Sequence, residues 1–244
     1  MILKSVKQEY ISLLTNIRGY FQDSHDSIHK ARNEIKILDF ENQKLVVKAF
    51  KVPNFINKIV YTFFRGTKAK KSYENSIRIS QFVPQAIGYI EFRKFGLLSD
   101  SYFVSEQFVY DFTIREVITG ADFQDRETIF KELAKFTFLL HEDGILHKDY
   151  SPGNILIKVN DSGYEFKIVD INRMEFKDLN VDERLKNFSQ LWAKDNDLKI
   201  IIDAYSALIN QDKDTCFAKA VAYSQKHKDR KNFKKRLKGR AVVD

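Results

Sequence analysis

Polar residues of the types that phosphoryl transfer requires cluster between His147 and Asp170. In the segment HKDYSPGN, Asp149 precedes Asn154 by five residues, and Asp170 follows a second apolar run. The oxygens of Asn154 and Asp170 are hard ligands that suit Mg²⁺, which leaves the Asp149 carboxylate to orient an attacking hydroxyl. Transfer of a γ-phosphate depends mainly on positioning and on neutralising oxygen charge, so this combination fits that reaction.

A short hairpin is expected to bring these residues together. The apolar runs NILI and FKIVD are joined by residues 160–163 (NDSG), which have the composition of a tight turn. A hairpin holds both strand ends at one edge, so Asn154, which starts the first strand, and Asp170, which ends the second, should lie beside the loop of Asp149. The competing interpretation is an ordinary buried hairpin whose polar residues cluster by chance.

The upstream sequence predicts a sheet and a helix that carry two further charged residues. Residues 35–40 and 44–50 have the pattern of two strands joined by a turn, and Lys48 lies in the second of them. Residues 67–82 have apolar side chains at helical spacing and include Glu74.

Further along the chain the pattern changes from strands to helices. Two more strand-like segments, 86–92 and 102–107, precede a segment from Asp125 to Gly144 whose apolar residues have the spacing of an amphipathic helix. After Met174 the pattern is again helical. These elements predict an α+β, two-lobed fold.

The two lobes are expected to share one domain that spans residues 1–244. The strand-rich N-lobe is expected at residues 1–104. The compact, mostly helical C-lobe is expected at residues 105–244, and it includes a basic segment at 226–240.

In this order the residues resemble the protein-kinase superfamily. The loop matches H-x-D-x-x-x-x-N and is followed by a triplet that begins with Asp170. The resemblance implies that His147 braces the loop, that Asp149 is the catalytic base, and that Asn154 and Asp170 bind Mg²⁺.

The same resemblance implies ATP as the cofactor. Lys48 stands where the phosphate-binding lysine is expected, and Glu74 lies on the next helix, where its ion-pair partner is expected. A bilobal kinase-like fold would bind adenine at a hinge near residues 105–108, where Glu106 and Phe108 would contribute backbone groups.

The sequence departs from protein kinases in several features. No G-x-G-x-x-G occurs in the first forty residues, so backbone amides and Lys30 or Arg32 would cover the phosphates. The triplet at 170–172 is D-I-N, no A-P-E follows it, and Ser151 stands where Ser/Thr protein kinases usually carry a lysine. The usual platform for a peptide is therefore expected to be absent, which favours a small-molecule acceptor.

Three segments resemble the lipopolysaccharide core kinases more closely: LVVKAFKVPNFINKIVYTFFRGTKAKKSYENS, HKDYSPGNIL and VDINRMEF. The resemblance covers roughly residues 25–210 and is strongest at the catalytic loop. It implies transfer from ATP to a sugar hydroxyl of heptose or 3-deoxy-octulosonic acid (Kdo). The acceptor would be lipid-linked, at the cytoplasmic face of the inner membrane of a Gram-negative bacterium.

The positive charge of the chain is local. The net charge is +8, and the segment 226–240 has nine Lys or Arg against one Asp, so the rest of the chain sums to zero. This segment is compatible with an anionic membrane surface, with steering of an acidic acceptor, or with a solvated terminus. Nucleic acid is the weakest alternative and is not expected as a partner, because Phe233 is the only aromatic residue among these charges.

The hydropathy of the sequence and its cysteine content limit where the protein is located and which covalent links it forms. No stretch of eighteen uncharged apolar residues and no secretory signal occur, so a cytoplasmic protein is expected. The resemblance and the basic segment add the expectation that it associates peripherally with the inner membrane. Cys216 is the only cysteine and cannot form an internal disulfide.

Two other functions remain open at this point. One is a small atypical protein kinase of the RIO type, because this class also has a shortened C-lobe. The other is a pseudokinase or nucleotide-binding scaffold, which the missing glycine-rich loop and the altered triplet would allow. The charged residues that the chemistry needs are all retained, which argues against the scaffold.

Overall fold

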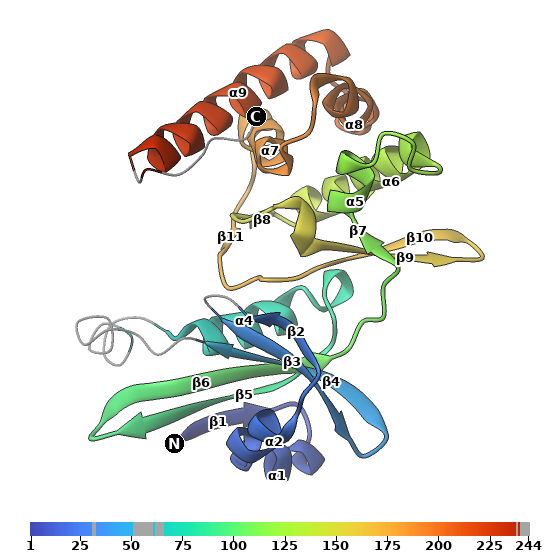
Figure 1. Ribbon diagram of the computed structural model, residues 1–244. Coiled ribbons are helices and arrows are strands. Elements are labelled where there is room, and N and C mark those ends of the chain that lie inside the picture. The colour runs from blue at the N-terminus through green and yellow to red at the C-terminus, as the bar shows by residue number, and fades with distance from the viewer. Residues whose placement is uncertain (31–32, 51–60, 62–65, 238, 240–244) are drawn as a thin grey trace. The chain divides into compact units, whose positions relative to one another are not determined.

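The computed structural model describes residues 1–30, 33–50, 61, 66–237 and 239, and it divides into two compact units. Unit 1 comprises Met1–Val109 together with Asp170–Asn172, and unit 2 comprises Tyr110–Val169 with Arg173–Asp244. Unit 1 is rich in strands and unit 2 in helices (Figure 1).

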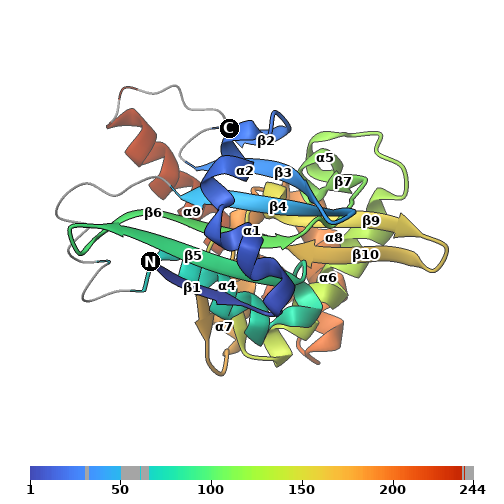
Figure 2. The ribbon, with the colours of Figure 1, turned by 90° about the horizontal axis from the view of Figure 1, so that it is seen from below.

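Unit 1 is built on a six-stranded antiparallel sheet with the order β1-β5-β6-β4-β3-β2, whose strands run side by side in Figure 2. The strands are β1 (Ile2–Ser5), β2 (Ser27–Lys30), β3 (Glu34–Phe40), β4 (Gln43–Phe50), β5 (Ala86–Lys94) and β6 (Leu97–Glu106). The predicted hairpin at 35–50 is confirmed, and only Glu41 and Asn42 lie between the paired residues at its end. Their φ angles of 48° and 64° are left-handed, which matches the twist of the strands in a two-residue turn.

Each face of this sheet has its own hydrophobic core. Val104 belongs to a buried cluster with the helices α1 (Ile11–Thr15) and α2 (Ile17–Asp23), whereas Phe103 packs against a cluster that contains α4 (Lys68–Arg78). Neighbouring residues of a strand point to opposite faces, so the two sets of helices cover opposite sides of the sheet.

Helix α4 corresponds to the helix predicted at 67–82. The hydroxyl of Thr67 accepts a hydrogen bond from the backbone N–H of Lys70, which caps the first turn. The helix ends at Arg78, and residues 80–82 form a separate 3₁₀ turn. Its buried face contributes Ala69 and Tyr73 to the core beneath the sheet.

The first strand and the first two helices were not predicted from the sequence. Strand β1 pairs with β5 at the edge of the sheet. A Cβ atom on Gly88 would lie 2.5 Å from the carbonyl oxygen of Lys4 and 2.7 Å from Cδ1 of Leu14. Only glycine therefore allows β1 and α1 to lie this close to β5.

Unit 2 combines several helices with one three-stranded and one two-stranded sheet. The elements are β7 (Phe112–Thr113), α5 (Ile114–Thr119), α6 (Arg126–Glu142), β8 (Ile145–His147), β9 (Ile155–Asn160), β10 (Gly163–Ile168), β11 (Met174–Phe176), α7 (Val181–Phe188), α8 (Asp195–Leu208) and α9 (Lys213–Arg236). Thr113 and Glu116 form a capping box at the start of α5. The helix predicted from Asp125 to Gly144 is confirmed as α6. The carboxy-terminal helices are also confirmed, and α9 carries residues 226–236 of the basic segment.

The predicted hairpin around the turn at 160–163 is confirmed as β9 and β10 (Figure 1), but its second strand is shorter than expected. The pairing ends with Ile155 opposite Ile168, followed by one bond from Val169 N to Asn154 O at 2.9 Å. The prediction that Asp170 ends the strand is therefore wrong by two residues. The left-handed φ of Asp170, 57°, is the physical reason, because a strand cannot continue through that conformation.

No helix among the described residues is long and apolar enough to cross a membrane.

Candidate active site

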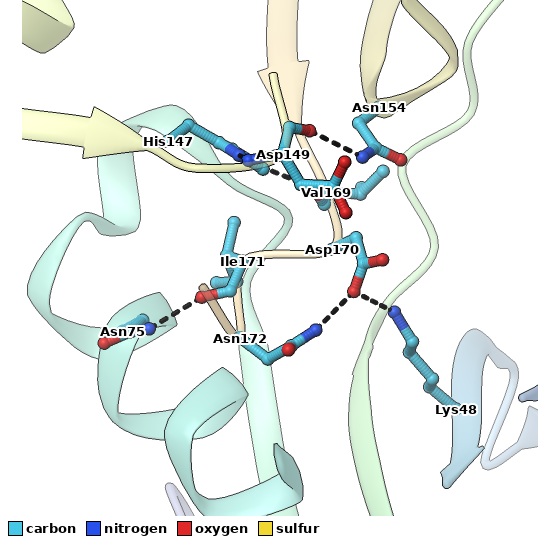
Figure 3. A network of polar contacts seen from close by, with 9 residues as sticks. All are labelled: Lys48, Asn75, His147, Asp149, Asn154, Val169, Asp170, Ile171 and Asn172. Carbon is cyan, nitrogen blue, oxygen red and sulfur yellow. Dashed lines mark hydrogen bonds and ion pairs between the residues drawn. The ribbon is translucent and has the colours of Figure 1, made fainter. Parts of the chain in front are cut away.

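Lys48 and Asp170 form an ion pair within unit 1. The Nζ atom of Lys48, on β4, lies 2.5 Å from Oδ1 of Asp170, and the two side chains are 12% and 32% exposed. The side-chain amide of Asn172 donates to the same carboxylate oxygen at 2.5 Å, so both donors point at Asp170 (Figure 3). A partly buried pair is screened less by salt than a surface pair, so each charge stabilises the position of the other.

Helix α4 holds the triplet 170–172 through an asparagine. The Nδ2 atom of Asn75 donates to the carbonyl oxygen of Ile171 at 2.6 Å (Figure 3). The Ile171 side chain is buried, which anchors the middle of the triplet. Together these contacts fix the backbone on which Asp170 and Asn172 stand.

The structure does not bring Glu74 and Lys48 together. The Glu74 carboxylate is 54% exposed and forms its ion pair with Lys70, four residues earlier on α4, at 3.8 Å. Successive residues of a helix point about 100° apart, so a helix that directs Asn75 at the triplet turns Glu74 towards solvent. The carboxylate beside Lys48 is that of Asp170.

In unit 2, His147 braces the loop that carries Asp149. The Nδ1 atom of His147 accepts the backbone N–H of Asp149 at 3.0 Å, and Nε2 faces the carbonyl oxygen of Val169 at 3.0 Å. Because Nδ1 accepts, the proton of this imidazole is on Nε2, which donates to Val169. The ring is buried and links the loop to the residue directly before Asp170.

Further bonds hold the loop by its backbone and leave two side-chain groups without partners in the part of the chain that the structure describes. The carbonyl oxygen of Asp149 accepts a hydrogen bond from Ser151 N at 2.7 Å. It also accepts from Asn154 Nδ2 at 2.9 Å (Figure 3). Among the described residues, no side chain or backbone group bonds to the Asp149 carboxylate or to Oδ1 of Asn154. Both groups therefore remain available for a ligand.

Two amide side chains support this loop: Asn187 lies in α7, and Gln190 lies just after it. Asn187 Nδ2 and Gln190 Nε2 donate to the carbonyl oxygen of His147 at 3.0 and 3.3 Å. The Oε1 atom of Gln190 also accepts the backbone N–H of Tyr150 at 3.2 Å. The loop is thus attached to the helical part of unit 2 at two backbone positions, His147 and Tyr150.

Asn187 is itself held by a buried histidine. His141 Nε2 lies 3.2 Å from Oδ1 of Asn187, and His141 Nδ1 lies 2.7 Å from the hydroxyl of Tyr205. Burial lowers the pKa of the His141 imidazole to about 4, so the ring is neutral near pH 7. A neutral ring can serve both neighbours without placing a charge in the core.

The expected hinge residues lie at the end of β6. Glu106 N donates to the carbonyl oxygen of Gln85, and Gln107 N donates to that of Lys44, both at 2.9 Å. The backbone groups of Phe108, by contrast, have no hydrogen-bond partner among the described residues. The Phe108 backbone therefore has a donor and an acceptor to offer to a ligand such as adenine.

The chemistry of the oxygen donors fits Mg²⁺. Asn154 offers a neutral amide oxygen and Asp170 a carboxylate, which are hard ligands of the kind that Mg²⁺ takes alongside water and phosphate oxygens. Among the described residues there is no cluster of three or more His, Cys, Asp or Glu side chains that would make an all-protein metal cage. Donors of these types suit a metal that arrives with a phosphorylated ligand.

Sequence reasoning missed the amides that position the site: Asn75, Asn172, Asn187 and Gln190. Asn172 is the third residue of the triplet, so its place in the motif was a usable signal, whereas the other three act through tertiary contacts. Arg32, expected to cover phosphates, lies outside the described residues, and so does the side chain of Lys30.

Comparison with known proteins supports the fold. No protein-family model and no curated protein sequence matches the chain. The fold is similar to that of WaaP in complex with acyl carrier protein, with a TM-score of 0.60, 14% identity, and coverage of 93% of this chain and 99% of that chain. Another similar structure is the Rio2 kinase–ADP/Mg²⁺–phosphoaspartate complex from Chaetomium thermophilum, with a TM-score of 0.47, 16% identity, and coverage of 83% and 61%.

The likeness to WaaP extends over nearly all of both chains. With the strand-rich unit 1 and the helical unit 2, it confirms the predicted class, an α+β protein-kinase-like fold.

Proposed function

We propose that this protein is an ATP-dependent kinase that transfers the γ-phosphate to a sugar hydroxyl, of Kdo or heptose, in the inner core of lipopolysaccharide. The observation that supports it most is the loop of Asp149. Its backbone is tied at the N–H and at the carbonyl, whereas its carboxylate has no hydrogen-bond partner among the described residues. A purely structural aspartate would use its carboxylate for such bonds, whereas a catalytic base needs it open.

In this proposal Asp149 accepts the proton of the acceptor hydroxyl. The acceptor oxygen forms a bond to the γ-phosphorus as the bond from that phosphorus to the β-γ bridging oxygen breaks, which yields the sugar phosphate and ADP. The proton on Asp149 then passes to solvent. The backbone bonds of the loop keep the carboxylate in place, so little reorganisation is needed during the reaction.

The remaining residues bind the nucleotide. Lys48 contacts the α- and β-phosphates, and the backbone of Glu106 and Phe108 binds adenine. Asn154 and Asp170 hold Mg²⁺, which neutralises charge on the phosphate oxygens when it is bound. Asp170 follows Val169 in the chain, and the backbone N–H of Val169 donates to the carbonyl oxygen of Asn154.

The acceptor class rests on the sequence resemblance. The segments HKDYSPGNIL and VDINRMEF resemble the lipopolysaccharide core kinases, and Ser151 replaces the lysine that Ser/Thr protein kinases usually carry. The overall likeness to WaaP is consistent with this class because it covers 93% of the chain.

The direct test measures transfer of labelled γ-phosphate from Mg-ATP to Kdo-lipid A and to heptosylated core acceptors. We expect label in one of these glycolipids, and we expect Asp149→Asn to reduce the rate about 10²- to 10⁴-fold. The control variant Asp161→Asn changes a carboxylate in the exposed β9–β10 turn and should leave the rate unchanged. Absence of label from both acceptors, while ATP binds, would exclude the proposed substrate class.

Labelling and ATP-turnover assays with the same purified protein distinguish the proposed function from two rival functions. Strong labelling of a protein mixture with no glycolipid labelling would indicate a RIO-type protein kinase. ATP binding without any turnover would indicate a scaffold, whereas turnover that Asp170→Ala abolishes would exclude it.

We also propose that the end of α9 contacts an anionic membrane surface. Phe233 and Leu237 are 61% and 71% exposed, and their spacing of four residues places them on one face of the helix. Arg230 and Lys234, which are also exposed, lie at neighbouring helical positions. Apolar side chains bordered by cations suit the interface of an anionic bilayer, where each cation contributes about 1 kcal/mol close to the surface.

Cosedimentation with vesicles tests this contact. Binding to vesicles that contain anionic lipid should exceed binding to zwitterionic vesicles and should decrease with salt. The double variant Phe233→Ser, Leu237→Ser should weaken it, whereas Leu139→Ser, at an exposed leucine of α6, should not. Equal binding to both vesicle types would contradict the proposal.

A further inference from the structure

Arg115, on α5, lies against the catalytic loop. A Cβ atom on Gly153 would collide with Nη2 of Arg115 and would lie 3.0 Å from its Cζ and 3.4 Å from its Nε. The guanidinium therefore occupies the space that a side chain at this loop position would take. Gly153 is the residue directly before Asn154 and lies four residues after Asp149, so a cation stands beside the segment that carries both groups.

The guanidinium of Arg115 has no hydrogen bond or ion pair among the described residues. Two other arginines of unit 2 are paired: Arg126 lies 2.5 Å from Asp197, and Arg184 lies 2.5 Å from Glu142. The acidic neighbour of Arg115, Glu116, uses its carboxylate in the capping box of α5. Arg115 is thus an exposed cation that makes no direct ion pair among the described residues, and its charge acts on Glu116 without a direct contact.

A second cation without a partner belongs to the same loop region. The carbonyl oxygen of Arg173 accepts the backbone N–H of Lys148 at 3.0 Å, and the exposed guanidinium of Arg173 has no partner among the described residues. Lys148 itself is neutralised by Glu175. Arg115 and Arg173 thus have guanidinium groups without an ion-pair partner among the described residues, and arginine binds carboxylate and phosphate groups with two parallel hydrogen bonds.

We propose that Arg115 binds an anionic group, a carboxylate or a phosphate, of the acceptor and so makes the enzyme selective for acidic sugars. This inference rests on the proposed function and specifies its substrate class. The acceptor hydroxyl must lie at the Asp149 carboxylate during transfer. A group elsewhere on the same sugar or on its neighbour would then reach the cation that stands over Gly153, and Arg115 would position the hydroxyl by holding the acidic group.

Steady-state kinetics with an acidic acceptor provide the first test. We expect Arg115→Glu to raise the KM for the acceptor about tenfold or more, and to leave the KM for ATP within about twofold. Arg115→Lys, which retains the charge but loses the bidentate geometry, should have an intermediate KM. Arg93→Glu makes the same change of charge at an exposed position of β5 and should behave as the wild type.

Changing the acceptor distinguishes recognition from a structural effect. When the acidic group is removed, by esterification of a carboxylate or hydrolysis of a phosphate, the wild type and Arg115→Glu should have the same KM. The group that Arg115 binds, carboxylate or phosphate, is the one whose presence on the acceptor restores the difference in KM between the wild type and Arg115→Glu. An equal loss with neutral and acidic acceptors, or a rise in the KM for ATP alone, would overturn the inference.

A binding experiment separates this inference from the proposed function. Free Kdo and heptose phosphate are titrated into the protein without ATP, and the wild type should bind one of them more tightly than Arg115→Glu. Gly153→Ala should weaken binding in the same way, because its Cβ displaces the guanidinium while the charge remains. If such binding occurs but no phosphate is transferred, only the proposed function fails. If the wild type and Arg115→Glu bind alike, or neither binds, the inference is wrong.

Discussion

The buried histidine behind the loop of Asp149 should make the stability of the protein depend on pH. His141 is 1% exposed, and burial lowers its pKa from 6.5 to about 4, an effect to which the charge of Arg184 adds and which the hydrogen bond to Asn187 opposes. Below pH 6.5 the unfolded chain takes up a proton at this residue, whereas the folded chain does not until about pH 4. The folded state is therefore fully stable above pH 6.5 and loses stability as the pH decreases towards 4.

The size of the effect follows from the shift. The pKa decreases from 6.5 to about 4, or 2.5 units, and about 1.4 kcal/mol per unit gives about 3 kcal/mol when the change is complete. At pH 5 the loss should be about 2 kcal/mol relative to pH 8. Carboxylates with lowered pKa values, such as Asp100 and Glu116, lose their contribution only below about pH 4.5 and so lie outside this window.

Urea denaturation followed by far-UV circular dichroism at pH 8, 7, 6 and 5 would measure how the free energy of unfolding changes with pH. Fluorescence of Trp192 is less suitable, because His227 stacks edge-on against that ring and burial, with Lys231 and Arg230, also lowers the pKa of His227. His141→Gln should remove most of the slope, and His227→Gln should remove only the part that the lowered pKa of His227 contributes. A wild-type stability that is flat from pH 8 to 5, or a slope that is undiminished in His141→Gln, would refute this reasoning.

Three further substitutions test a close backbone approach in unit 1, and a helix cap and a hydrogen-bond donor in unit 2. Gly88→Ala should lower the free energy of unfolding by about 2 kcal/mol in urea titrations, because its Cβ would overlap Leu14, and an unchanged value would contradict that close approach. Asn180→Ala removes the capping box of α7 and should cost about 1 kcal/mol in the same assay, whereas Asn180→Ser should restore most of it. Asn187→Leu deprives the His147 carbonyl of a donor and should lower kcat at least tenfold while the KM for ATP remains, so an unchanged kcat would show that Gln190 suffices.

Local patterns were sufficient for most elements of the fold. The hairpin around Glu41 and Asn42 and the helix from Arg126 were predicted because their turn residues and apolar spacing leave few alternatives. The helices α1 and α2 carried a usable signal, since Leu13, Ile17 and Phe21 recur at intervals of four and are buried. The strand β1 had none, because four residues with alternating exposure at the edge of a sheet resemble any polar terminus.

Only those residues of the candidate site that belong to a local sequence motif could be predicted. The loop spacing from His147 to Asn154 and the triplet at Asp170 are local, and the structure shows how hydrogen bonds hold them. The partner of Lys48 depends on how far α4 is rotated, which the sequence of one helix does not determine. The result is that Asn75, not Glu74, faces the triplet.

The distribution of hydrogen bonds in the loop bears on whether the site is catalytic or only structural. Every bond that the structure assigns to Asp149 is made by its backbone, and the amide of Asn154 uses its nitrogen and leaves its oxygen open. Evolutionary loss of activity would remove any reason to keep a partly buried carboxylate without a partner, because such a group costs stability. The structure instead holds the backbone through His147 and Asn187 and leaves these side-chain oxygens unbonded among the described residues, which supports the proposed phosphotransferase over a nucleotide-binding scaffold.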